Sequence, residues 1–374
     1  MIVMKRSFSA CAISANSVTL KRSKHTLSSC EITSDSNNKC SNNSSGSNNS
    51  SGTDFTDNDN IIGKVVVDLD SFKRQQELNL CNCTTYHNNT ELNDNMRAIL
   101  IDWLTEIAEL YKLHTNTIHL TIGYIDKITR KQYIHIGQYQ LVGTACLVIA
   151  CKFDDSKTPS FNSLVSLSNY DFDSDDLVMM EKVIIDQLHF EFHLPTRDYF
   201  SRRLTVVAKL NEKEAALLEF ITELSLRDSS LNLYRMSQVA AAAVHYIYQC
   251  LRNKNTLLWT SELETYTGYR EYDLVPIVIR LAQLHSAIDN DKTSKNILLK
   301  YQRPSYFSVG YTTAINVTKL RFGIRVNLDN YVNHPSSTVP TVPLKLEFSK
   351  SSKSSYSSFG DYSSRNSFEN GYFP

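Results

Sequence analysis

The sequence has little glycine, little proline and no excess of charge of either sign. Of 374 residues, 11 are Gly and 8 are Pro, and 39 Lys and Arg are balanced by 39 Asp and Glu. A zero formal charge argues against a globally basic nucleic-acid binder and against a polyacidic tail protein. The scarcity of helix breakers, with 41% hydrophobic residues, indicates a helical globular protein.

Long apolar runs are also missing. The longest, Leu141–Cys151, spans 11 residues and is interrupted by Thr144, which is too short to cross a bilayer. The N-terminal residues MIVMKRSFSACAIS lack the uninterrupted apolar core of a secretory signal. We therefore expect no membrane association and no secretion.

The eight cysteines form no regular framework. Two lie in the most apolar segment and three in a low-complexity tail, so reduced thiols in an intracellular protein are a better interpretation than disulfides. Cys81, Cys83 and His87 could suggest a metal, but no second ligand pair follows at zinc spacing. We predict no metal site and no cofactor.

Both ends of the chain are of low complexity. From Ser36 to Ser51, 13 of 16 residues are Ser or Asn, a composition that buries too little apolar area to offset the entropy of ordering. The stretch from Ser349 is likewise Ser-rich. We expect residues 1–60, and the chain from 349 onward, to be disordered.

The region from about Glu91 to Arg303 has the periodicity of helices. Apolar residues recur at three- and four-residue steps from Met96 to Leu110, and Asn93 and Asp94 are placed as caps. This pattern predicts a helix with one apolar face.

Three more helices are expected in the first half of this region. One runs from Thr115 to Arg130. The segment from Leu141 to Phe153 is apolar around its whole circumference, which is typical of a helix enclosed by others. The third opens at Asp173–Asp176, and Pro195 is expected to stop it. No segment of alternating polarity predicts a strand.

A shift of 97 residues superimposes this region on itself. It carries Asp176-Leu177-Val178 onto Asp273-Leu274-Val275, an identical tripeptide, and Trp103 onto Phe200. Apolar positions also coincide along the other expected helices. The sequence therefore predicts an all-α protein built from two copies of one helical unit.

These residues resemble the cyclin family. The run from Met96 to Leu104 resembles the opening of the cyclin box in A- and B-type cyclins. Further motifs follow in the family's order and spacing: Tyr124-Ile125-Asp126, Gln140–Ala145, Ala150–Phe153, Met180-Glu181 and Leu188-His189-Phe190. The similarity extends from about Leu92 to Arg303.

The resemblance implies an organisation and a role. It implies two tandem five-helix cyclin folds, at 92–194 and 195–303, with an N-terminal helix and linker at 61–91 and a C-terminal extension at 304–374. It also implies a non-enzymatic subunit, in the nucleus and cytoplasm, that binds and activates a cyclin-dependent kinase in cell-cycle control. We expect neither nucleic acid nor a membrane as partner.

Three groups of site residues follow from the resemblance. Arg97 and Asp126 match a structural ion pair between the first two helices. The residues that match kinase contacts are Lys152, Phe153, Glu181, Ile185, Phe190 and Phe192. The residues that match a hydrophobic patch for Arg-x-Leu peptides of substrates or inhibitors are Met96, Ile99, Leu100, Trp103, Glu106 and Gln140.

The kinase-contact group and the patch group each have a plainer interpretation. A Lys and a Glu on helices are more often solvated surface, and the apolar residues of both groups could be core, with Leu100 serving both purposes. One departure concerns the patch, because Ile136 stands where the family often has a basic residue. Another precedes the first repeat, where the segment Val65–Phe72 carries a degraded form of the family's N-terminal helix.

Two other functional classes remain as alternatives. Arg227-Asp228 with Asn232 resembles a kinase catalytic loop, but the spacing is one residue short and no phosphate-binding loop is present. A cyclin-fold transcription factor would need a basic face, such as one around Arg202, Arg203 and Lys209. Residues 92–303 carry 23 basic and 26 acidic side chains, which disfavours DNA binding. An atypical or transcriptional cyclin is the nearer alternative.

Overall fold

A computed structural model describes residues 67–78, 91–155, 157–253, 257–291, 293 and 295–324. Within these ranges every regular element is helical, so the all-α prediction is confirmed. The two ends expected to be disordered lie outside the described residues, as do Cys81, Cys83 and His87.

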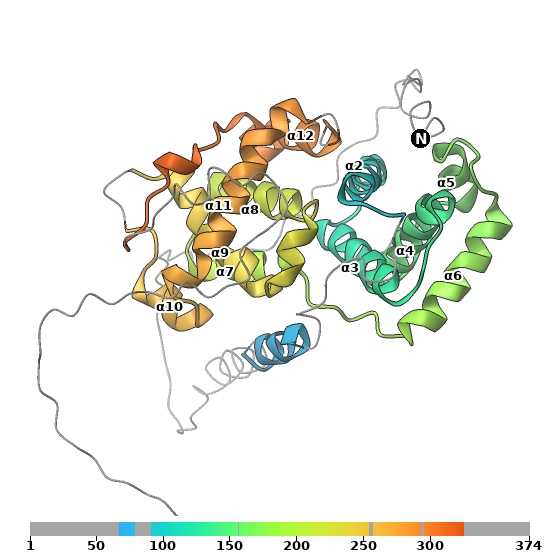
Figure 1. Ribbon diagram of the computed structural model, residues 1–374, viewed down its shortest axis with the longest axis horizontal. Coiled ribbons are helices and arrows are strands. Elements are labelled where there is room, and N and C mark those ends of the chain that lie inside the picture. Colours follow the sequence, from blue (N-terminus) through green and yellow to red (C-terminus); the bar gives the residue numbers. More distant parts are fainter. Residues whose placement is uncertain are drawn as a thin grey trace, which may run out of the picture. The chain divides into compact units, whose positions relative to one another are not determined.

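Two five-helix repeats follow one another along the chain (Figure 1). The first repeat consists of α2 (Asp94–Tyr111), α3 (Thr115–Lys131), α4 (Tyr139–Asp154), α5 (Phe161–Leu167) and α6 (Ser174–Leu188). The second consists of α7 (Arg197–Val207), α8 (Glu212–Ser225), α9 (Met236–Leu251), α10 (Ser261–Thr267) and α11 (Glu271–Ala287). Helices α3 and α8, α4 and α9, and α6 and α11 each begin 97 residues apart, which confirms the internal repeat.

Capping residues set where the helices begin. The Asn93 side chain accepts the Met96 N–H at the start of α2, and Asp173 forms a capping box with Asp176 at the start of α6. One detail of the first helix was wrong. Leu110 is 62% exposed, because the buried face of α2 continues through Ile107 and Ala108 instead.

The third helix of each repeat lies at its centre. Helix α4 packs against α2, α3 and α6, and α9 packs against α7, α8, α10 and α11. A Cβ on Gly143 of α4 would lie 2.9 Å from Leu100 Cδ1, so glycine is what allows α2 to approach this closely. The stretch Ile136–Asp154 is long and apolar enough to cross a membrane by length and composition, but 61% of that window is buried among the other helices.

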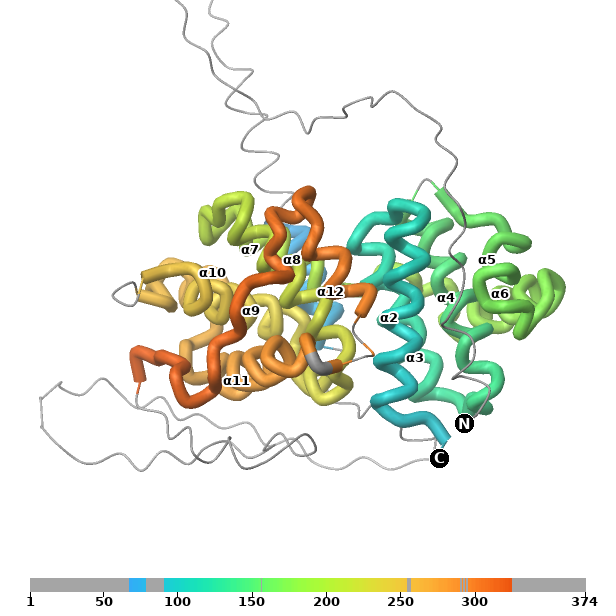
Figure 2. The backbone as a smooth tube through the Cα atoms, turned by 90° about the horizontal axis from the view of Figure 1, so that it is seen from above, coloured from blue at the N-terminus to red at the C-terminus, as the bar shows by residue number. Residues whose placement is uncertain are grey.

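Helix α12 (Lys295–Tyr301) follows the second repeat and returns to the first, where it lies beside α2 (Figure 2). The buried Asp102 carboxylate accepts the backbone N–H groups of Asn296, at 3.0 Å, and Ile297, at 3.2 Å. At the other end, Lys300 Nζ and the Tyr301 hydroxyl both donate to buried Glu223 at 2.7 Å. Helix α12 thus connects the two repeats.

The residues after α12 return across the second repeat. The backbone N–H of Arg321 donates to Gln249 Oε1 and that of Gly323 to Glu271 Oε2, both at 2.8 Å. Between them, the Phe322 ring stacks on the buried His245 ring with centroids 5.4 Å apart. We call residues 315–324 the C-terminal strap.

Candidate functional site

Arg97 and Asp126 form a buried, bidentate ion pair. Arg97 Nε and Nη2 lie 2.8 and 2.7 Å from the two Asp126 oxygens. The second repeat completes the site, because Arg97 also donates to the Leu226 carbonyl and Asn232 Nδ2 donates to Asp126 at 2.9 Å. The pair therefore joins the two repeats as well as α2 and α3.

Lys152 and Glu181 meet on the face formed by α4 and α6. Lys152 lies in the last turn of α4, Glu181 lies in the middle of α6, and their charged groups are 2.5 Å apart. The Lys152 side chain is 50% exposed and that of Glu181 12%. An ammonium has three N–H donors and a carboxylate has four acceptor positions, so both groups keep capacity for a partner.

Several large apolar side chains on the same elements are exposed. They lie on α6, at the end of α4 and just after α6: Phe153, Val178, Met179, Val183 and Phe190. Ile185 and Phe192 are partly buried beneath them. Val178, Met179 and Val183 were not among the predicted contacts, although their apolar character on a helix that also buries Leu177, Ile184 and Leu188 was a usable signal.

The backbone after α6 presents Phe190 outward. His189 and Phe190 both adopt left-handed conformations, with φ of 53° and 58°, and the Phe190 N–H donates to the Ile185 carbonyl. This arrangement ends the helix, so the expectation that Pro195 stops it was wrong. Phe190 is 70% exposed, and a non-glycine residue held at positive φ is an observation often associated with functional sites.

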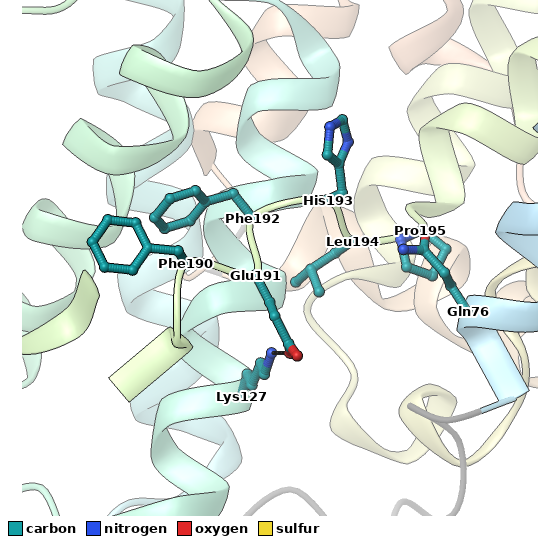
Figure 3. A pocket seen from close by; sticks show the side chains of 8 residues that line it. All are labelled: Gln76, Lys127, Phe190, Glu191, Phe192, His193, Leu194 and Pro195. Atoms are coloured by element: carbon teal, nitrogen blue, oxygen red, sulfur yellow. Dashed lines mark hydrogen bonds and ion pairs between the residues drawn. The ribbon is translucent and has the colours of Figure 1, made fainter. Parts of the chain in front are cut away.

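A pocket of about 330 Å³ adjoins Phe190 and Phe192 (Figure 3). It is bounded by the connection between the repeats, by Lys127 of α3 and by Gln76. The Lys127 ammonium pairs with Glu191 at 2.6 Å. The exposed Phe190, just after α6, therefore borders a partly polar hollow that Gln76 of the helical residues 67–78 also lines.

The patch on α2 is narrower than predicted. Leu100 and Trp103 are buried, and Leu100 packs over Gly143, so these two serve the core. Met96, Ile99 and Gln140 are half-buried and Glu106 is exposed, and these four form the accessible part. Glu106 Oε2 accepts Asn296 Nδ2 of α12 at 3.1 Å, a contact from 190 residues away that the sequence did not indicate.

The residues that resembled a kinase catalytic loop have internal partners. Arg227 Nη2 donates to Asp291 at 2.8 Å, Arg280 pairs with Asp228, and Asn232 bridges Arg197 and Asp126. These contacts join the connection between α8 and α9 to other parts of the fold, which is a structural role.

The basic cluster considered for DNA binding is largely neutralised. Arg202 pairs with Asp198 at 2.7 Å and Arg203 with Asp70 at 3.1 Å. Among the residues that the structure describes, no group of three His, Cys, Asp or Glu side chains could hold a metal ion. Cys146 and Cys151 are buried free thiols, and burial raises the pKa of Cys151 to about 12.

Comparison with known proteins agrees with this architecture. Residues 69–193 match the family profile "Cyclin, N-terminal domain", and residues 195–314 match "Cyclin, C-terminal domain". The X-ray structure of a viral cyclin from herpesvirus saimiri superimposes with a TM-score of 0.52 and 20% identity, over 57% of this chain and 95% of that one. At that identity the likeness concerns the fold.

Curated relatives are mitotic cyclins. The G2/mitotic-specific cyclin-A of Hydra viridissima is 34% identical over 222 residues, covering 58% of this chain and 51% of the relative. Cyclin-B2-2 of Arabidopsis thaliana is 34% identical over 228 residues, covering 61% and 53%. The chain thus spans about half the length of these relatives. With both cyclin profiles matched in order over the two helical repeats, the chain belongs to the cyclin family.

Proposed function

We propose that this cyclin is a regulatory subunit that binds and activates a cyclin-dependent protein kinase in cell-cycle control, in the nucleus and cytoplasm. Cyclins are regulatory subunits rather than enzymes. The proposed kinase contacts are Lys152, Phe153, Glu181, Ile185, Phe190 and Phe192. The mitotic cyclins among the relatives support a role in cell division.

The observation that carries the proposal is the exposed aromatic face beside the Lys152–Glu181 pair. Phe153, which follows Lys152, is 37% exposed and Phe190 is 70% exposed. Both rings contact Phe192, with centroids 5.9 Å apart, and contiguous apolar exposure of this kind marks interaction surfaces. A partner that covered this face would desolvate Lys152 and Glu181. Their charge-assisted hydrogen bonds to the partner's backbone would then be stronger than in water.

Activation follows if the partner has two conformations. A kinase that exposes the matching helix only in its active conformation gains the interface free energy in that conformation alone. Binding then shifts the population toward the active state. No chemistry by the cyclin itself is required.

We further propose that the accessible patch on α2 recruits Arg-x-Leu peptides. Met96 and Ile99 offer an apolar surface for the leucine, and exposed Glu106 offers a carboxylate for the arginine. Glu106→Lys should weaken binding of such a peptide to the assembled complex, without reducing the amount of kinase recovered.

The test of kinase binding is co-purification of the full chain from dividing cells, followed by a protein-kinase assay on the recovered complex. The decisive variant exchanges the charges, Lys152→Glu with Glu181→Lys. The internal ion pair is kept, while both charges presented to a partner are reversed. We expect the wild type to recover an active kinase and the exchanged variant to lose it, with unchanged helicity by circular dichroism.

The matched control exchanges two exposed charges on α8 of the second repeat, Glu212→Lys with Lys213→Glu. It should recover as much kinase as the wild type. A folded wild-type chain that recovers no kinase, or an exchanged variant that recovers as much as the control, would overturn the proposal.

A further inference from the structure

The helical residues 67–78 are bound to the second repeat through one acidic side chain at their start. Asp70 accepts the Tyr199 hydroxyl at 2.5 Å, the Tyr266 hydroxyl at 2.8 Å and Arg203 Nε at 3.1 Å. Its side chain is only 13% exposed. One carboxylate thus collects donors from both α7 and α10.

Two further charged residues on the same face of this helix complete the contact. Arg74 donates to the Thr267 carbonyl at 3.1 Å and lies over the Phe200 ring, 5.9 Å from its centroid. Glu77 is buried and accepts both the backbone N–H of Ser237, at 2.9 Å, and its hydroxyl, at 2.6 Å. Residues 70, 74 and 77 are spaced so that they share one side of a helix.

The groove that holds this helix is the repeated counterpart of the patch on α2. The shift of 97 residues carries Trp103 onto Phe200, Glu106 onto Arg203 and Gln140 onto Ser237. Each of these three second-repeat residues contacts the helical residues 67–78. The sign of the charge is inverted, because a carboxylate in the first repeat becomes a guanidinium in the second.

We propose that the groove between α7, α9 and α10 is a second peptide-docking groove, selective for an amphipathic helix with Asp, Arg and Glu at positions i, i+4 and i+7. Its occupant is residues 67–78 of the same chain. The groove is therefore filled in cis.

Binding in trans tests this directly. Asp70→Arg with Glu77→Arg in the full chain removes both carboxylates from the cis helix and leaves the groove residues unchanged. A fluorescein-labelled peptide of residues 67–78 should bind this variant, as measured by anisotropy. The peptide should bind the wild type at least roughly tenfold more weakly, because the wild-type groove is already filled. It should also bind a triple variant that carries Arg203→Asp at least roughly tenfold more weakly, since one hydrogen bond to a charged group is lost.

A charge exchange within the full chain keeps the test independent of the peptide. Arg203→Asp should speed amide hydrogen exchange in residues 71–78 by roughly tenfold to hundredfold, the range for losing one such bond. Adding Asp70→Arg should restore protection. The proposal is overturned if the Asp70→Arg, Glu77→Arg variant keeps the wild-type melting temperature and binds no peptide. It is also overturned if Arg203→Asp leaves the exchange rates of residues 71–78 unchanged. Neither measurement uses a kinase, so its failure is distinct from failure of the proposed function.

Discussion

The two repeats share their helices and differ in what lies on their surfaces. In the second repeat, the helical residues 67–78 and the C-terminal strap fill two grooves of α7, α9, α10 and α11. In the first repeat, Met179 and Phe190 are exposed, and Glu106 stays exposed although Asn296 of α12 donates to it. The same helical unit is therefore covered by other segments in the second repeat and more open in the first.

The residue at the position equivalent to Lys152 also differs between the repeats. Lys152 falls on Gln249 under the shift of 97, and neutral Gln249 holds the strap by one backbone N–H. The charged Glu271 also accepts a backbone N–H of the strap. The difference at this position is therefore that Gln249 is occupied by the strap, whereas Lys152 is half-exposed.

The largest effect is expected where the repeats are joined. Arg97→Ala leaves Asp126 buried without its cation and should lower the free energy of unfolding by about 3–5 kcal/mol, as measured by urea denaturation. Because Leu226 and Asn232 of the second repeat share this site, both repeats should lose stability together. The Arg97→Ala, Asp126→Ala double variant should be less destabilised than the single one. Two separate transitions, with only the first repeat weakened, would contradict the joining role.

The second repeat should lose stability in acid through His285. Burial lowers the pKa of His285 to about 4, and its Nδ1 lies 2.9 Å from the Tyr246 hydroxyl. The unfolded chain takes up a proton near the ordinary pKa and the folded chain does so only near 4, so stability falls as pH falls between these values. The loss should be about 3 kcal/mol relative to His285→Gln. Urea unfolding of both proteins at pH 7 and pH 4 measures it, and parallel pH curves would contradict it.

The first repeat should respond in the opposite direction through Asp102. Burial raises the pKa of this α12-capping carboxyl to about 6, so the folded chain binds its proton at a higher pH than the unfolded chain does. This group therefore adds stability as pH falls from above 6 to about 4, by about 2–3 kcal/mol. Asp102→Asn should remove that contribution, which unfolding of the two proteins at both pH values would show. A variant that keeps the wild-type pH dependence would exclude this assignment.

The loss of stability on replacing a phenylalanine by alanine should differ between the covered second repeat and the exposed face of the first. Phe322→Ala removes the ring that stacks on His245 and should lower stability by about 2 kcal/mol, with faster amide exchange at Arg321 and Gly323. Phe190→Ala, at a position of the first repeat that is 70% exposed, should change the stability of the free chain by less than about 1 kcal/mol. Equal losses would remove the distinction between the two faces.

The smallest effect is expected from the Lys152–Glu181 pair in the free chain. Because the Lys152 side chain is half-exposed, Lys152→Ala should shift the free energy of unfolding by about 0.5 kcal/mol or less. Kinase recovery should fall far more than stability does. Thermal melting beside the co-purification assay compares the two, and a large loss of stability would assign the pair to the scaffold instead.

Local sequence patterns were sufficient for the helices and their repetition. Spacing, caps and composition depend on residues three or four positions apart, and the pattern at Asn93, Met96 and Asp173 therefore reads directly as α2 and α6. The register of 97 residues followed from the same local patterns occurring twice. The sites at Lys152 and Glu181 came from the resemblance to cyclins, because no spacing alone distinguishes a partner contact from solvated surface.

Local sequence patterns did not predict the contacts between distant segments. The helical residues 67–78, which overlap the segment Val65–Phe72 that looked degraded, proved to carry Asp70, Arg74 and Glu77 for the second repeat. The partner of each lies more than a hundred residues away. Leu100 became core because Gly143 lets α2 approach α4. The sequence by itself determined which faces are apolar and where helices begin. Only the tertiary structure decided which of those faces another segment covers, because covering depends on long-range packing and not on the helix that bears the face.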